Sequence, residues 1–485
     1  MGNREASDVS LGGETTKATL AKFTMAAAGF VGTIVFARLL GPFGIGGYYL
    51  LMTVIQVSNT PINGLSAAVQ KRLSESNFEG AEAMTIATLV ALVWTGIGVA
   101  SAYLFRERFA AFVGFSEPVL AFGILMGALN LFSLYQGALS ATGQIGRTRW
   151  IDAFRSYLTL PAQLVLVWIG LGAAGMAYGE AVATLLLLAP LLNSTANFSQ
   201  PTWATAKSLW EYAKYSIPNR YLSRMYDELD ILILGLLLTE GAAGHYGVAF
   251  RLSLPGMYIA MVASSGLFSR VSNLSSKNEP ITDDIRNTLA FTSLFAIPML
   301  FGGTILNKEI VTTLYGSEFK PAALLLTGLL FYQLIRTQST PLERVVGGLD
   351  RPDVVTRVYL VLFVVNVVVG VGLTYLLGAI GVVLATILAE TIRYVALLVH
   401  LHQEGLGIPL LQRPIIEQIF SGLVMGAALI GLKSFVPISS WFVLGCLVAT
   451  GAITYFGVLF VASDQFRNTV FDSLDDIYPT WRDLM

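Results

Sequence analysis

The sequence is poor in charge, cysteine and histidine, and each shortage excludes a class of site. Charged residues make up 13% of the 485 residues, whereas a soluble globular protein carries roughly 25%. Cys446 is the only cysteine, which excludes an intramolecular disulfide and a cysteine-cluster metal site. His400 and His402 lie two residues apart and cannot share one face of a helix. We therefore expect no bound metal.

The usual signatures of catalysis and nucleotide binding are also missing. The chain has no HExxH pair, Walker loop or nucleophile elbow, so we expect no catalytic residue, no cofactor and no direct use of ATP. A formal net charge of −1 gives no support for a nucleic-acid partner, and we expect none. Residues 1–18 are polar and lack an apolar core, which argues against a cleavable signal peptide.

Apolar sequence, by contrast, is abundant. Hydrophobic residues make up 54% of the chain, and runs of about 20 recur, each long enough to cross a hydrocarbon core of roughly 30 Å. We predict an all-α polytopic membrane protein with about 14 transmembrane helices. The helices are expected at 19–40, 44–69, 82–105, 118–142, 150–171, 174–196, 212–238, 242–273, 285–306, 319–346, 354–377, 379–402, 415–433 and 438–461.

Three turn motifs return after about 200 residues, which indicates a duplicated chain. The matches are Gly46 with Gly244, Tyr48 with Tyr246, Gly143 with Gly348, and 171–175 with 377–381. Each copy holds six helices, so both copies should have the same orientation around a shared cavity, with two helices added at the end. The expected parts are a polar N-terminus (1–18), an N-terminal lobe (19–196), a linker (197–211), a C-terminal lobe (212–402), two extra helices (415–461) and a tail (462–485).

The distribution of lysine and arginine predicts the orientation in the membrane. Basic residues gather in alternate links and at both ends of the chain, whereas the opposite links carry few. By the positive-inside rule, both termini should lie in the cytoplasm. Representative basic residues of these links are Lys71, Arg72, Arg147, Arg149, Lys207, Lys214, Arg270, Lys277, Arg344, Arg351 and Arg413.

Six segments occur along the chain in a characteristic order: 37–42 with Tyr48, 141–143, 171–175, Ile217-Pro218, 230–235 and 245–252. In this order they resemble the polysaccharide-type flippases of the multidrug/oligosaccharidyl-lipid/polysaccharide transporter superfamily. The resemblance covers about residues 18 to 461.

That resemblance implies a transporter in the cell membrane that moves a polyprenyl-linked saccharide to the outer leaflet by alternating access. Membrane lipid, and glycosyltransferases or a polymerase of the same pathway, would be partners, and we expect a monomer. One alternative is a multidrug or cation extruder of the same superfamily, which should centre on carboxylates. Another is a membrane glycosyltransferase or polymerase, which should show a large loop with catalytic side chains.

Charged residues inside predicted helices each cost roughly 2.5–3.5 kcal/mol on insertion scales, so each needs a reason. Arginine forks suit the phosphate of a lipid-linked sugar, and amides suit its hydroxyl groups. The substrate-binding candidates are Arg38, Gln56, Asn59, Asn63, Arg224 and Arg251, and the candidates for gating or ion pairing are Asp227, Glu228 and Asp230.

Several of these charges have a structural alternative. Arg38 lies near a helix end and can reach the headgroups, and Asp230 with Arg251 would serve equally as an ion pair or a gate. Two further pairs should be structural. They are Arg155 with Glu180, and Glu390 with Arg393.

Two features concern the shape of the helices. Residues 59–64 and Pro255-Gly256 should interrupt the second helix of each repeat, as rocking lobes would require. The extra helices 415–433 and 438–461 are rich in small residues, which suit either close packing or an apolar groove for a polyprenyl tail. Gly426 and Gly431 would line that groove.

Overall fold

The computed structural model describes residues 11–75, 80–195, 198–277, 279–435 and 440–477. Within these ranges the regular structure is entirely helical, and ten helical stretches are long and apolar enough to cross a membrane. The expectation of an all-α polytopic membrane protein is confirmed. Part of the expected N-terminus (1–18), the first residue of the expected linker (197–211) and the end of the expected tail (462–485) lie outside the described residues.

The chain forms two compact units, Met1–Gly244 and His245–Met485. The division falls within helix α8, whereas the sequence places the boundary between repeats at 197–211. The reason is packing: α7 lies against α1 in the first unit. The boundary between the duplicated segments is a separate question and stays a prediction.

The first unit is built around α1, which contacts α2, α4, α5, α6 and α7. Helix α1 breaks at Gly41, where φ is 68° and ψ is −179°. This is the break that Gly41-Pro42 predicts, because Pro42 lacks an N–H. The helices are α1 (Leu11–Leu73), α2 (Gly80–Leu104), α3 (Arg106–Val113), α4 (Pro118–Ala141), α5 (Ile145–Leu166), η1 (Val167–Leu171), α6 (Gly172–Thr195) and α7 (Trp203–Leu237).

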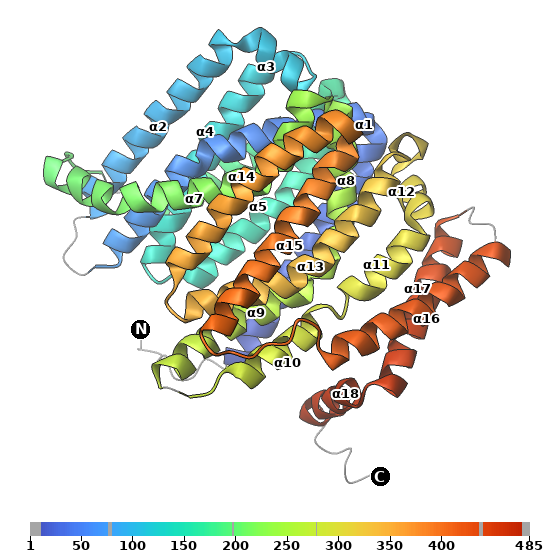
Figure 1. Cartoon of the computed structure of the whole chain (residues 1–485). Coiled ribbons are helices and arrows are strands. Elements are labelled where there is room, and N and C mark those ends of the chain that lie inside the picture. The colour runs from blue at the N-terminus through green and yellow to red at the C-terminus, as the bar shows by residue number, and fades with distance from the viewer. Residues whose placement is uncertain (1–10, 76–79, 196–197, 278, 436–439, 478–485) are drawn as a thin grey trace. The chain divides into compact units, whose positions relative to one another are not determined.

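The second unit has two apolar cores. One lies among α9, α10, α13 and α15, and the other joins α11 to the last helices, with α16 and α17 packed side by side (Figure 1). Its elements are α8 (Glu240–Ser253), η2 (Leu254–Met257), α9 (Tyr258–Ser276), α10 (Thr282–Thr292), α11 (Ala296–Ile305), α12 (Asn307–Tyr315), η3 (Ser317–Phe319), α13 (Ala322–Gly348), α14 (Pro352–Leu377), α15 (Ala379–Gln403), α16 (Arg413–Phe435), α17 (Trp441–Ala462) and α18 (Asp464–Ile477).

Three short elements and one break were not predicted. Helices α3 and α12 follow the third predicted helix of each repeat, and α18 follows the last one. The helix predicted at 285–306 is divided into α10 and α11. Pro298 lies just after this break, and it cannot donate a hydrogen bond to the carbonyl of Leu294.

Backbone angles test the paired turns of the duplication. Gly172 (φ 54°, ψ −138°) and Gly378 (φ 64°, ψ −145°) share one conformation, as their matching motifs predict. The pairing of Gly143 with Gly348 is wrong by two residues. Gly143 has φ 80°, whereas Gly348 is helical and Asp350 takes the left-handed position with φ 61°. The turn conformation, rather than the glycine, is therefore what recurs.

The third matched pair makes a reciprocal backbone contact. A Cβ on Gly46 would lie 1.8 Å from the carbonyl oxygen of Glu240, and a Cβ on Gly244 would lie 2.0 Å from that of Pro42. Each carbonyl belongs to the residue four positions before the other glycine. Two equivalent turns thus meet face to face, and glycine is required at both positions.

The predicted pair of helix interruptions is only half present. Pro255 and Gly256 lie in the 3-10 segment η2, which separates α8 from α9. In α1, Pro61 lies inside a helix whose only non-helical residue is Gly41. The interruption predicted at 59–64 is therefore wrong, because the chain accommodates Pro61 without leaving the helical conformation.

Candidate functional site

Helices α1 and α7 run against each other in opposite directions within the first unit. Two glycines allow their close approach: a Cβ on Gly235 would lie 2.3 Å from the Leu50 side chain, and one on Gly64 would lie 2.5 Å from that of Ile217. Near the second contact, the Ser216 hydroxyl donates to the Gly64 carbonyl at 2.9 Å. Polar side chains between these two points are held at a tight helix interface.

A polar seam lies between the two glycine contacts. The Thr53 hydroxyl donates to Glu228 Oε2 at 2.7 Å, and Arg224 donates to Glu228 Oε1 at 3.2 Å. Thr53 and Glu228 are buried, whereas the Arg224 side chain is 38% exposed. The structure therefore brings together two predicted site residues, Arg224 and Glu228, and adds Thr53, which the sequence reasoning missed. The local sequence does not reveal the role of Thr53, because its partner Glu228 is 175 residues away.

The three predicted amides lie further along α1. Asn59 is buried, with 6% of its surface exposed, and no group among the described residues hydrogen-bonds its Oδ1 atom. Gln56 and Asn63 are half-buried at positions three and four residues away. A buried acceptor without a partner costs about 1–3 kcal/mol. Asn59 is therefore the residue of this set that gains most from a donor such as a hydroxyl group.

The remaining site candidates lie on α1, α7 and α8. Arg38 and Asp227 are exposed, and Asp230 is buried in α7 with 7% of its surface accessible. Arg251 is half-buried in α8 and belongs to the second unit. Whether Asp230 and Arg251 act as a gate or as an ion pair stays a prediction.

The predicted pair of Arg155 and Glu180 is confirmed, and it belongs to a larger network in the first unit. Arg155 lies 3.7 Å from Glu180 Oε1, and the Tyr48 hydroxyl donates to Glu180 Oε2 at 2.7 Å. Gln163 donates to the Tyr48 hydroxyl at 3.3 Å, and Asp152 pairs with Arg155 at 3.2 Å. Tyr48 was predicted only as a repeat marker, yet it ties α1 to α5 and α6.

The second predicted pair, Glu390 with Arg393, is also confirmed and lies deep in the second unit. Arg393 donates to Glu390 Oε1 at 3.0 Å, and the two side chains are 5% and 0% exposed respectively. Glu343 on α13 also pairs with Arg393, Ser339 donates to Glu390, and the Tyr359 hydroxyl donates to Glu343 at 3.2 Å. The sequence could show only the partners three residues apart on one helix.

Comparison with known protein families identifies the family of this chain. A family model described as polysaccharide biosynthesis protein matches residues 35–324, more than half of the chain. The chain belongs to this family. The resemblance to the polysaccharide-type flippases is thereby confirmed. The match includes the whole of α7, most of α1 and the seam between them.

Individual relatives agree with the family. The probable low-salt glycan biosynthesis flippase Agl15 of Haloferax volcanii is 27% identical over 457 residues, which cover 93% of this chain and 95% of that protein. A structure of the lipid II flippase MurJ in an inward closed conformation has a TM-score of 0.79 at 15% identity, covering 94% of this chain and 100% of that one. An inward-facing multidrug resistance MATE family transporter of the MOP superfamily has a TM-score of 0.61 at 14% identity, covering 81% and 100%. The two structures show a shared fold.

Proposed function

We propose that this family member is a flippase for a polyprenyl phosphate- or pyrophosphate-linked oligosaccharide, which it moves from the cytoplasmic to the outer leaflet by alternating access. The saccharide would serve surface polysaccharide or glycoprotein assembly. Family membership and the name of the Haloferax relative support the substrate class. The protein would act as a monomer, beside glycosyltransferases or a polymerase of the same pathway.

The observation that carries the proposal is the way Arg224 is held. One nitrogen of its guanidinium group donates to Glu228, and Thr53 fixes Glu228 from the other helix. The Arg224 side chain is nevertheless 38% exposed, so the rest of the fork is accessible and already oriented. A planar guanidinium in this state suits bidentate binding of phosphate oxygens. The unpartnered Oδ1 of Asn59 on the adjacent helix suits a sugar hydroxyl.

The cation extruder is less consistent with the pairing of three carboxylates on the predicted helices. Glu180, Glu228 and Glu390 each have an arginine partner within the described structure. A carboxylate that already faces a guanidinium attracts an organic cation weakly, because its charge is neutralised locally. The extruder would need such a carboxylate to be available to its substrate.

The elements described above support the finer topology that we propose. Two of the ten apolar stretches are 45 and 50 residues long and break at a glycine with positive φ, Gly41 and Gly170, so each would cross the membrane twice. Helices α7 and α13 are long enough to add two more crossings. Fourteen crossings, arranged as two six-helix repeats and two further helices, would place both termini on one side.

We expect that side to be the cytoplasm. This can be tested by cysteine-accessibility labelling in a variant that lacks Cys446. A cysteine introduced at Lys71 or Lys207 should not react with a membrane-impermeant reagent added from outside. A cysteine at Arg108 or Lys308 should react with it, because these residues lie in the links with few basic residues. The opposite pattern would reverse the orientation and the direction of transport.

Removal of a substrate-binding arginine should impair export without loss of the protein. Alanine at Arg38, Arg224 or Arg251 removes a charge-assisted contact with phosphate, worth roughly 1.5–3 kcal/mol, and should weaken substrate affinity about tenfold or more. Alanine at Arg357, which is exposed and pairs only with Asp353 in the described structure, is the matched control. Export of the lipid-linked saccharide in cells, normalised to membrane protein level, is the measurement. Full export by all three variants would contradict the anionic-substrate model.

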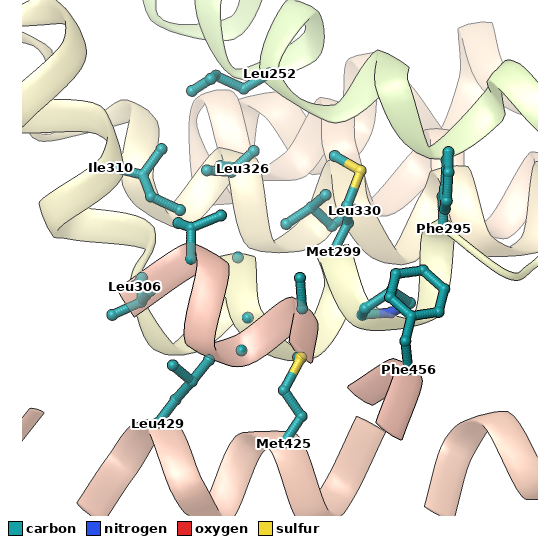
Figure 2. Close-up of a pocket in the computed structure, with 16 residues that line it drawn as sticks. Leu252, Phe295, Met299, Leu306, Ile310, Leu326, Leu330, Met425, Leu429 and Phe456 are labelled. Atoms are coloured by element: carbon teal, nitrogen blue, oxygen red, sulfur yellow. The ribbon is translucent and has the colours of Figure 1, made fainter. Parts of the chain in front are cut away.

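An apolar cavity supports a site for the polyprenyl tail in the second unit. The cavity has a volume of about 320 Å³ and lies among α11, α13, α16 and α17. Figure 2 shows Met425 and Leu429 of α16 and Phe456 of α17 around it, with Met299 and Leu330 on the other side. An apolar cavity of this kind stays free of water and accepts hydrocarbon.

The structure changes the residues that test this site. Gly426 packs against Ile305 and Gly431 faces open space, so neither lines the cavity as predicted. Ala452 does line it. Tryptophan at Ala452 should therefore reduce transport of long-chain substrates several-fold more than that of short-chain analogues, and tryptophan at Gly431 should affect neither. Equal inhibition of both substrates by Ala452→Trp, at normal protein level, would assign these helices to packing alone.

A further inference from the structure

Helices α2, α3 and α4 belong to the first unit and lie near one another (Figure 1). A second cavity is lined by residues of these helices and of the link before α4. It is a groove of about 740 Å³, and its apolar wall includes Val99 of α2 with Leu120 and Ile124 of α4. Leu120 is 57% exposed and Ile124 is 39% exposed. The apolar wall of the groove is therefore open, and it runs along two helices that are expected to cross the membrane.

One end of this groove is charged. Arg106, Glu107 and Glu117 line it together with Tyr103. Arg106 donates to the Tyr103 hydroxyl at 3.2 Å, and its guanidinium lies 5.3 Å from the ring centroid. Within the described residues, none of these three charged side chains forms an ion pair with another part of the chain. Two carboxylates and one guanidinium thus line the charged end of the groove.

The position of the charged end relative to the membrane follows from the flanking helices. The membrane spans Gly80–Leu104 and Pro118–Ala141 end and begin on either side of residues 105–117. The charged end of the groove must then lie at the boundary between hydrocarbon and water, and the apolar wall must face the hydrocarbon core. The charged end of the groove therefore matches the headgroup of a membrane lipid, and the apolar wall matches its acyl chains.

The corresponding place in the second unit is covered by the chain itself. Helix α12 also follows an apolar helix and also has a glutamate, Glu309, in its first turn. Lys433 of α16 pairs with Glu309 at 2.9 Å and donates to the Ile305 carbonyl at 2.8 Å. Apolar residues of α16 and α17 cover the cavity beside α12. The extra helices therefore supply an ammonium group and an apolar cover, and the first unit has no helices in that role among those described.

We propose that the groove of the first unit binds a membrane lipid whose headgroup carries both a phosphate and an ammonium group. Arg106 binds the phosphate, and Glu107 and Glu117 bind the ammonium group, as Glu309 binds that of Lys433. The acyl chains lie along the apolar wall. A purely anionic headgroup is disfavoured, because the two carboxylates exceed the single guanidinium. This lipid is a bound component of the membrane, and its site is independent of the transport function proposed above.

Lipid titration of the purified full-length protein tests this site. Phosphatidylethanolamine should be retained in native mass spectra and should raise the melting temperature more than phosphatidylglycerol does, since a ligand of the folded state stabilises it. Arg106→Ala should weaken phosphatidylethanolamine binding about three- to tenfold, the range of one partly exposed charge-assisted contact. Arg108→Ala removes the same charge from the same short helix but outside the groove, and it should leave binding unchanged.

A charge reversal gives the sharper outcome. The double variant Glu107→Lys/Glu117→Lys should prefer phosphatidylglycerol, because three cations then line the charged end. The melting temperature without added lipid reports folding separately for every variant. Equal binding of the two lipids by the wild-type protein would overturn the proposal, as would equal effects of Arg106→Ala and Arg108→Ala.

Discussion

Leucine at Gly46 or at Gly244 is expected to abolish transport and to leave little folded protein. Even a Cβ at these positions would lie 1.8 Å and 2.0 Å from a backbone carbonyl oxygen, so the backbone must move apart before any side chain fits. Overpacking costs typically about 1–3 kcal/mol when side chains can adjust, and more when only backbone can yield. Monodisperse protein recovered after extraction, measured by size-exclusion chromatography, reports the effect.

The control for this prediction is a glycine of another helix that faces open space. At Gly96 of α2 and Gly431 of α16, the position that a Cβ would occupy has no neighbouring atom within 4 Å, and leucine there should preserve both protein level and transport. Alanine at Gly46 is the smallest possible change and should already reduce recovery. Wild-type recovery and transport in Gly46→Leu would show that the two turns do not meet as described.

Loss of Arg393 is the second large effect that we expect. Arg393→Leu leaves Glu390, a side chain with 0% exposure, without its cation, and breaking a buried ion pair costs roughly 3–5 kcal/mol. The variant should show a strongly reduced melting temperature in detergent and low accumulation in membranes. Because total stabilities are about 5–15 kcal/mol, this is a large share of the whole.

A double variant separates the lost pair from the lost side-chain volume. Arg393→Leu/Glu390→Gln removes both charges, so no uncompensated carboxylate remains at the most buried position, and it should recover most of the stability. Glu343 is 20% exposed and tolerates the change better than Glu390. A single variant as stable as the wild type, or a double variant as unstable as the single, would refute this explanation of the buried pair.

The sequence predicts those parts of the fold that depend on local pattern. Apolar runs locate the long helices, Gly41-Pro42 locates the break in α1, and the spacing of Glu390 and Arg393 locates an ion pair on one helix face. Each of these signals lies within a few residues of the feature that it predicts. For the same reason, the motifs at 171–175 and 377–381 predict the matching turns at 172 and 378.

The missed features depend on distant partners or on short elements. Thr53 meets Glu228 only because Gly64 and Gly235 bring α1 and α7 together, and a single sequence does not show which helices pack. Helices α3 and α12 are too short for an apolar period to be visible. The sequence pairs Gly143 with Gly348, whereas the left-handed conformation of Gly143 recurs at Asp350, a residue that seldom adopts it.

The sequence predicts the residue types of the candidate site better than the contacts between them. The sequence predicts an arginine and amides from their chemistry, and the structure places Arg224 at the interface of α7 with α1 and buries Asn59 on α1. The sequence allows either gating or pairing for Glu228, and in the structure Glu228 pairs with Arg224 and holds one end of its guanidinium group. That orientation makes Arg224 the best-defined candidate for anion binding among the predicted intramembrane charges.

Transport in proteoliposomes tests the central claim most directly. Purified protein would be reconstituted with a polyprenyl pyrophosphate-linked saccharide that carries a fluorophore, and a membrane-impermeant quencher would report the fraction in the outer leaflet over time. Wild-type protein should accelerate translocation over protein-free vesicles, and Arg224→Ala should slow it about tenfold or more at subsaturating substrate. Failure of the wild-type protein to move this substrate, together with uptake of an organic cation by the same vesicles, would contradict the flippase account.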